Sequence, residues 1–346
     1  MKYIVSAYSG LGNTVQLSSI IGPILESDKK AEITFISDNN FGQLDFLELI
    51  EGINIQRHGK SFSLSNLVSL WKIIKNFEYL VLPYVGTPIM IQLASYLTGK
   101  TIYQHEPISW NKAKFLLYFF KIFNHKIILV PANAEVIEEV RYLNLIEDFV
   151  RPSDTHREIK IDLTGQESIF KKFKVPTKYI CVQVGGANGG KTPKVWPKEN
   201  VIEFLRIFLN SMPNCSVILL GDKLDKEKYD IDISGAINLI GKTSIVELVN
   251  ILNSSMAVIC NDSSLLHLSN LFRLKTYVLL GPTLKEFPES GFIETIKADL
   301  PCMPCLDGLK FSEEEALDNC PINNLCMKLV SPEIVLEKLT HHIQNS

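Results

Sequence analysis

The stretch KYICVQVGGANGGKTPKVWPKENVIEFL, residues 178–205, decides the fold class. The strand-like run KYICVQV passes into a glycine-rich turn, and an amphipathic helical pattern follows Pro197. A strand, a turn and a helix in this order predict one unit of a parallel sheet that carries helices on its faces. Similar units follow it toward the C-terminus and precede it toward the N-terminus.

The same alternation covers most of the chain and predicts an α/β protein with two doubly wound domains. A ligand cleft is expected between them, at the carboxyl ends of both sets of strands. The predicted strands are 2–8, 31–37, 78–84, 100–105, 126–131, 178–184, 216–221, 237–241, 256–261 and 276–281. The predicted organisation is an N-terminal domain (1–155), a linker (156–177) with one helix at 165–173, a C-terminal domain (178–330) and a terminal helix (331–346).

The composition is that of an ordinary folded protein. The 346 residues suggest two domains, and 46% apolar and 21% charged residues exclude extensive disorder. A net charge of −3 provides no global field to attract nucleic acid. The N-terminus lacks a signal-peptide pattern, and the apolar run at 115–123 is too short to span a bilayer. We therefore expect a cytoplasmic protein whose cysteines are thiols or metal ligands.

The glycine-rich turn GGANGGKT (185–192) matches the phosphate-binding pattern G-x-x-x-x-G-K-[ST]. In a nucleoside-triphosphate enzyme, a helix begins at the Gly-Lys-Thr of this pattern. Here Pro193 disfavours helical backbone at Thr192, and the next helix is expected to begin near Pro197. An ATPase or kinase is therefore the weaker hypothesis, although AVICND, ending at Asp262, could be its second motif. The glycines still allow a ligand to approach the backbone closely.

Four segments in this order resemble glycosyltransferase family 9, which includes the ADP-heptose:lipopolysaccharide heptosyltransferases. They are SGLGNTVQLSSII (9–21), KVWPKENVIEFL (194–205), the long segment 241–283 with NDSSLLH and LGPT, and the cysteine-rich segment 302–336. The resemblance implies a GT-B fold, with two Rossmann-like domains facing a central cleft. It also implies an inverting, metal-independent transfer of a sugar, heptose from ADP-heptose in the first instance, to a lipopolysaccharide-core or related surface-glycan acceptor. The lone D-x-D motif, at 230–232, is interpreted as a solvated loop.

The segment NDSSLLH predicts the donor site. Asp262, Ser263, Ser264 and His267 stand where a strand ends and a helix begins, and helix N-termini favour a diphosphate. The family pattern has glycine at the position of Ser264. The alternative interpretation is that Asp262 only caps the helix and that His267 is a core residue.

A lysine should stabilise the leaving diphosphate in place of a metal ion. Lys194 matches the family lysine of the K-x-W-P segment, and Lys191 competes for the same role. Asp222 and Thr243 are further candidates for contacts with the sugar, ribose or base. Gly12, in the turn SGLGNT, is also predicted to be at the donor site.

Asn13 departs from the family pattern. The family has aspartate here as the proposed general base, and an amide does not accept a proton near neutral pH. Another carboxylate could replace it, Glu106 first and Glu135 second. Alternatively, Asn13 only orients the acceptor, or the protein binds nucleotide sugars without transferring them.

Two further patterns leave alternatives open. Cys302, Cys305, Cys320 and Cys326 have spacing suited to a structural zinc or iron site, but free thiols or disulfides are alternatives. The segment WNKAKFLLYFFKIFNHK (110–126) mixes aromatic residues with lysines. It predicts either a core helix with lysines at its exposed edge or a helix in peripheral contact with the inner membrane.

Overall fold

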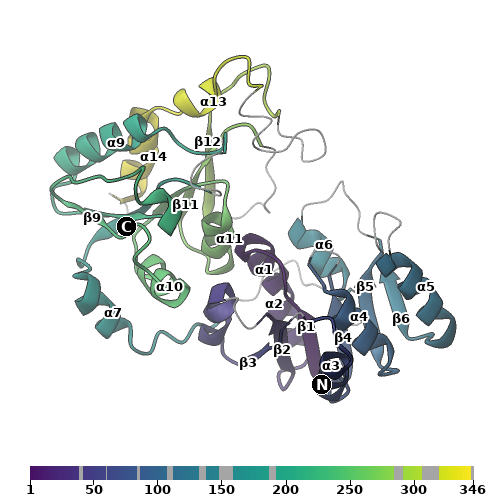
Figure 1. Cartoon of the computed structure of the whole chain (residues 1–346). Helices are drawn as coiled ribbons and strands as arrows, with labels where there is room; N and C mark the ends of the chain where they lie inside the picture. The colour runs from purple at the N-terminus through teal and green to yellow at the C-terminus, as the bar shows by residue number, and fades with distance from the viewer. Residues whose placement is uncertain are drawn as a thin grey trace. The chain divides into compact units, whose positions relative to one another are not determined.

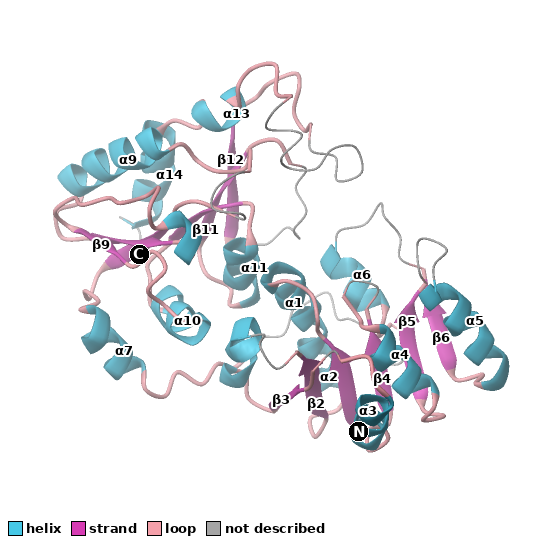
Figure 2. Cartoon of the chain, in the orientation of Figure 1, coloured by secondary structure: helices cyan, strands magenta, loops and turns pink. Residues whose placement is uncertain are grey.

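The computed structural model describes residues 1–38, 42–59, 61–83, 86–106, 112–131, 138–147, 159–186, 192–283, 291–305 and 319–343. The chain forms two compact units, Met1–Asp162 and Leu163–Ser346. Each unit contains one parallel sheet with helices beside it (Figures 1 and 2). Among the described residues, no helix has both the length and the apolar character needed to cross a membrane.

The first unit has a six-stranded parallel sheet in the order β3-β2-β1-β4-β5-β6. Its strands are β1 (Lys2–Ser6), β2 (Glu32–Ser37), β3 (Ile53–Arg57), β4 (Tyr79–Leu82), β5 (Thr101–His105) and β6 (Ile127–Val130). Its helices are α1 (Leu11–Leu17), α2 (Ile21–Ser27), α3 (Leu64–Ile74), α4 (Ile89–Tyr96), α5 (Lys112–Phe123) and α6 (Glu138–Asn144), with 3-10 helices η1 (Ser18–Ile20) and η2 (Gly42–Leu49).

The second unit repeats this plan with a sheet in the order β12-β11-β10-β7-β8-β9. Its strands are β7 (Tyr179–Gln183), β8 (Ser216–Leu220), β9 (Ala236–Asn238), β10 (Val258–Asn261), β11 (Thr276–Leu280) and β12 (Ile293–Lys297). Its helices are α7 (Gln166–Phe173), α9 (Lys198–Ser211), α10 (Ile245–Asn253), α11 (Ser264–Leu271), α13 (Leu325–Lys328) and α14 (Pro332–Ile343), with the 3-10 helix η3 (Lys223–Asp225).

The apolar strands of the second unit are buried on both faces, as parallel strands covered by helices should be. One face packs with Trp196, Phe204 and the residues of α9 and α14, while the other packs with residues of α10 and α11. Cys181, Cys215 and Cys260 are buried, as expected for cysteines that act as small apolar residues. Burial raises the pKa of the Cys181 thiol to about 12, so it stays protonated.

Helix α9 begins at Lys198, and Pro197 occupies the position just before it. This confirms the predicted helix start and excludes a helix beginning at Thr192, which the nucleoside-triphosphate pattern requires. Lys191 and residues 187–190 lie outside the described part of the chain. Helix α7 confirms the helix predicted at 165–173 and lies within the second unit, where Gln166 donates hydrogen bonds to the Asn250 carbonyl and the Ser254 hydroxyl.

Candidate active site

The end of β7 and the end of β10 lie side by side in the second unit. The chain leaves β7 to build β8 and β9 on one side, then returns to place β10 against β7 and continue to β12. This reversal is a topological switch point, where loops at the carboxyl ends of two neighbouring strands diverge and leave room for a ligand. Residues 184–186 follow β7, and Asp262, Ser263 and Ser264 follow β10.

Two side-chain amides, of which that of Asn261 is buried, hold three segments together at this point. The Asn261 side chain, 2% exposed, accepts a hydrogen bond from the Trp196 amide at 3.1 Å and donates one to the Gly185 carbonyl at 2.9 Å. Gln183 Oε1 accepts a hydrogen bond from the Ser263 hydroxyl at 2.8 Å. The sequence analysis did not identify Asn261 or Gln183, since neither belongs to a charged or motif-like pattern. Polar residues at the ends of adjacent buried strands are the signal that could have found them.

Lys194 and Asp262 meet at the same place. Lys194 Nζ lies 3.3 Å from Asp262 Oδ2, and the two side chains are only 24% and 11% exposed. The buried Trp196 anchors the lysine-bearing segment, because its indole N–H donates to the Val330 carbonyl at 2.8 Å. The structure therefore brings together two residues that the sequence analysis assigned to one site, although they are far apart in the chain.

Helix α11 begins beside this ion pair, and its N-cap is Ser263. The Ser263 hydroxyl oxygen accepts a hydrogen bond from the Leu265 amide at 3.3 Å. The alternative in which Asp262 caps this helix is wrong, because Ser263 is the N-cap. Ser264 and His267 lie on the first turn, each partly exposed. The helix start and the cation of Lys194 together favour an anionic group here.

A buried carboxylate shapes the loop after β7. Asp225, 1% exposed, accepts hydrogen bonds from the amides of Gly186 at 3.3 Å and Asp222 at 3.1 Å. Gly185 has a φ of +74°, and any side chain there would collide with the Asp225 carboxylate. Burial is the largest influence on the Asp225 pKa and raises it. Asp225 was not identified from sequence because it stands in a run of charged residues that otherwise face solvent.

The weaker donor-site candidates lie on neighbouring loops. Asp222 is exposed and caps η3, where its carboxylate accepts a hydrogen bond from the Leu224 amide at 2.5 Å. Thr243 is partly exposed and precedes Ser244, the N-cap of α10. Contacts of either residue with a sugar nucleotide stay predictions. Asp230 and Asp232 are exposed on either side of the buried Ile231, which agrees with a solvated loop.

The first unit has its own switch point, between β1 and β4. Gly12 and Asn13 lie in the first turn of α1, directly after β1, and both are partly exposed. Gly86, beyond β4, has a φ of +77°, and a Cβ atom there would come within 2.9 Å of the backbone of Tyr8 and Ser9. Glycine therefore allows the loop after β4 to approach the loop that joins β1 to α1.

Glu106 lies at the same edge of this sheet but on a different strand. It follows β5, and β4 separates β5 from β1, so the strands bearing Glu106 and Asn13 are about 10 Å apart. The Glu106 carboxylate accepts a hydrogen bond from the Tyr118 hydroxyl at 2.6 Å, and this bond raises the pKa of Tyr118. Glu135 lies outside the described residues. A catalytic role for Asn13 or Glu106 stays a prediction.

Glu139 is a buried carboxyl group that the sequence analysis missed. It lies on α6, which packs against α1, and is 8% exposed. Burial raises its pKa to about 7. The signal was present in the sequence, because Glu139, Tyr142 and Ile146 follow helical spacing and the last two are core residues. A carboxyl group that titrates near neutral pH is a recurrent feature of active sites.

The four clustered cysteines do not form a preformed metal site. Cys302 and Cys305 are exposed while Cys326 is buried, and none of the four forms a disulfide. Across the described residues, no group of three or more His, Cys, Asp or Glu side chains could hold a metal ion. Burial, with a smaller contribution from the neighbouring cysteines, raises the pKa of Cys326 to about 11, which disfavours the thiolate that a metal binds. Metal binding stays a prediction that would require these side chains to move together.

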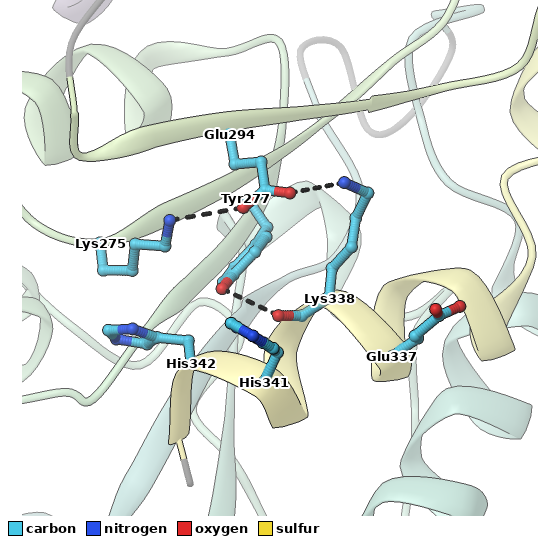
Figure 3. Close-up of a pocket in the computed structure, with 7 residues that line it drawn as sticks. All are labelled: Lys275, Tyr277, Glu294, Glu337, Lys338, His341 and His342. Atoms are coloured by element: carbon cyan, nitrogen blue, oxygen red, sulfur yellow. Dashed lines mark hydrogen bonds and ion pairs between the residues drawn. The ribbon is translucent and has the colours of Figure 1, made fainter. Parts of the chain in front are cut away.

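A polar pocket of about 470 Å³ lies elsewhere in the second unit, between α14 and the strands β11 and β12 (Figure 3). Glu294 binds Lys338 at 2.5 Å and Lys275 at 3.4 Å. The Tyr277 hydroxyl donates to the Lys338 carbonyl at 3.2 Å. Glu294 of β12 thus joins Lys338 of α14 to Lys275, which precedes β11, and links the helix to the sheet.

Replacing Glu294 by glutamine should loosen α14. Partial burial opposes ionisation of Glu294, but its hydrogen bond with Lys338 and the two lysine charges outweigh this and lower its pKa. Its contribution is therefore present near neutral pH and lost as pH falls through the lowered pKa. We expect Glu294→Gln to cost about 0.5–1 kcal/mol at pH 7, given solvent screening, and less at pH 3. Urea unfolding at both pH values checks this. The exposed pair Lys2–Glu32 supplies the control Glu32→Gln, and equal losses in the two variants would contradict the prediction.

Comparisons with known proteins place both units in one fold. The structure of E. coli ADP-heptose lps heptosyltransferase II matches with a TM-score of 0.74 at 16% identity, covering 100% of this chain and 99% of that one. E. coli heptosyltransferase WaaC with ADP-2-deoxy-2-fluoro heptose matches with a TM-score of 0.64 at 13% identity, covering 99% of both chains. The chain therefore has the GT-B fold, the two-domain architecture of a large class of glycosyltransferases.

The sequence comparisons identify the family within this class. The sequence model of Glycosyltransferase family 9 (heptosyltransferase) matches residues 107–313, more than half of the chain. Lipooligosaccharide heptosyltransferase 2 of Campylobacter jejuni serotype O:2 is 25% identical over 370 aligned residues, which cover 100% of this chain and 99% of that protein. The chain belongs to glycosyltransferase family 9 and is a glycosyltransferase enzyme.

Proposed function

We propose that this enzyme transfers a heptose from ADP-heptose to a hydroxyl group of a lipopolysaccharide-core or related surface-glycan acceptor, with inversion and without a catalytic metal ion. The observation that carries the proposal is the Lys194–Asp262 pair at the start of α11, at the switch point of the second unit. The named donors and products of the similar heptosyltransferases support the choice of sugar and acceptor.

The donor diphosphate would lie between Lys194 and the N-terminus of α11. When the bond from the sugar to the diphosphate breaks, negative charge builds on the phosphate oxygens. A fixed ammonium group and the positive end of the α11 dipole would stabilise that charge without the reorganisation that water would need. Asp262 holds the ammonium group in place, and the buried Asn261 fixes the backbone at Trp196, two residues beyond the lysine.

The proton of the acceptor hydroxyl needs a base other than Asn13. Glu106 is our first candidate, since it lies at the same edge of the sheet of the first unit and is partly exposed. Tyr118 holds its carboxylate through a hydrogen bond of 2.6 Å. Asn13 would then orient the acceptor through its amide, which can both donate and accept hydrogen bonds.

Calorimetric titration in a chelating buffer tests the donor. ADP-heptose, UDP-GlcNAc, GDP-mannose and ATP would each be titrated into the wild-type protein and the Lys194→Ala variant. We expect ADP-heptose to bind the wild type best and the variant more weakly. The ATP titration would be repeated with magnesium in place of the chelator, and binding of magnesium-ATP alone would overturn the proposal.

Asn13 favours one second candidate, a protein that binds the nucleotide sugar but does not transfer it. A turnover assay separates the two functions, with radiolabelled ADP-heptose and lipopolysaccharide from a heptose-deficient strain as the acceptor. Label transferred to the glycolipid by the wild type, and lost with Glu106→Gln, supports the transferase. Tight donor binding with no transfer to any core acceptor supports the second candidate.

A further inference from the structure

Helix α5 exposes an aromatic stripe to solvent. Its members follow the helical spacing i, i+3, i+4, i+7 and i+8, which places them on one face. The exposed fractions are 66% for Phe115, 37% for Tyr118, 47% for Phe119, 67% for Ile122 and 72% for Phe123. Leu117, on the opposite face, is fully buried, and Phe120 packs against the core of the first unit. The helix therefore has two apolar faces, of which the core uses one.

The rings of the stripe form one continuous surface. The ring centroids of Phe119 and Phe123 are 5.4 Å apart, and those of Phe115 and Phe119 are 6.5 Å apart. Single exposed apolar residues are common in folded proteins, but a contiguous patch of large ones marks a site of interaction. The sequence left a core helix and a membrane-surface helix as alternatives, and the helix has both a buried face and this exposed one.

Basic residues accompany the stripe. The helix sequence KAKFLLYFFKIF contains three lysines and no acidic residue, and the exposed Lys126 follows it. At about 100° per residue, Lys114 and Lys121 fall on one line along the border of the stripe. Aromatic residues beside lysines, on a helix too short to span a bilayer, characterise helices that lie in the membrane interface.

We propose that α5 docks this protein on an anionic phospholipid bilayer. The stripe enters the boundary between headgroups and acyl chains, and Lys114 and Lys121 lie at the level of the lipid phosphates. A second copy of the chain fits less well, because a symmetric contact between two α5 helices would bring lysines of the same sign together. The proposal rests on the first unit alone and does not depend on the sugar that the enzyme transfers.

Vesicle co-sedimentation tests the docking of the full chain. The vesicles would be pure phosphatidylcholine or phosphatidylcholine with phosphatidylglycerol, at low and high salt. The variants would be Phe115→Ser/Phe123→Ser, Lys114→Glu/Lys121→Glu and the control Phe62→Ser/Leu64→Ser. Phe62 and Leu64 are each 77% exposed but lie outside the stripe, so the control removes comparable apolar surface. Thermal unfolding of each variant would confirm that it is folded.

We expect the wild type and the control to bind the anionic vesicles and to release them as salt rises. The double serine variant should bind about tenfold more weakly or worse. The affinity of the double glutamate variant for anionic vesicles should fall at least about 25-fold, since each lysine near an anionic surface contributes about 1 kcal/mol. Failure of the wild type to bind any vesicle would overturn the proposal, and so would a double serine variant that binds like the control. A concentration-dependent dimer that the serine variant abolishes would assign the stripe to a second copy instead.

Discussion

Replacing Lys194 by alanine should lower the turnover number about 10²–10³-fold, the loss typical when one preorganised charge-stabilising group is removed. The lysine is held 3.3 Å from Asp262 in a largely buried position, so no water molecule can take its place with equal geometry. Donor affinity should fall less than turnover, because charge on the diphosphate increases as the sugar departs. Steady-state kinetics and donor titration on the same samples would separate the two effects.

Lys198→Ala is the matched control for this prediction. Lys198 lies four residues further on, in the first turn of α9, and is also partly exposed. Asp262→Asn should reduce turnover by a smaller factor, because the cation remains but loses its orientation. In the double variant Lys194→Ala/Asp262→Asn, the two losses of turnover should not add, since both substitutions act through one ion pair. Turnover of Lys194→Ala within a few-fold of Lys198→Ala would remove the lysine from the mechanism.

Glu139→Gln should make the protein more stable at pH 8. Burial raises the Glu139 pKa from its ordinary 4.5 to about 7 in the folded protein. Between these values the unfolded chain has lost this proton and the folded chain keeps it, so the free energy of unfolding falls as pH rises. Above pH 7, the ionisation of Glu139 lowers the free energy of unfolding by about 3 kcal/mol in total. Glutamine has a similar shape and no charge, so it avoids that cost.

Urea unfolding of the wild type and Glu139→Gln at pH 5 and pH 8 measures this. The variant's advantage should be small at pH 5 and large at pH 8. Glu147→Gln, at an exposed position just beyond α6, is the control and should show no such trend. An advantage that does not change with pH would show that Glu139 titrates normally. Transfer activity of Glu139→Gln and Glu106→Gln, measured together, then identifies which carboxyl group the reaction requires.

The alternation of strands and helices was predictable because parallel strands buried on both faces read as apolar runs. Strands β3 and β12 were missed, and both lie at the edge of a sheet. The sequences are INIQR for β3 and IETIK for β12, and in both of them polar residues interrupt the apolar ones, since an edge strand is only partly covered. The start of α9 was predictable because a proline just before a helix has a local effect that needs no tertiary contact.

The site was predictable only where residues stand in a local pattern. Asp262, Ser263 and Lys194 were identified from the segments that carry the family resemblance. The bonds of Asn261 to Trp196 and Gly185 join segments that are 65 and 76 residues apart, and no local pattern encodes them. For α5 the sequence left two alternatives open, because helical spacing does not say whether a second element covers the stripe.

The bond from Trp196 to Val330 has a consequence for how the enzyme is made. It joins residues that are 134 positions apart, and Asn200 donates a second hydrogen bond to the same carbonyl at 3.0 Å. The segment that carries Lys194 is thus anchored to the residue that lies just before α14. During synthesis from the N-terminus, this segment cannot form either bond until Val330 has been made. A chain that stops before Val330 would hold all the donor-site residues and yet lack the carbonyl that anchors the segment bearing Lys194.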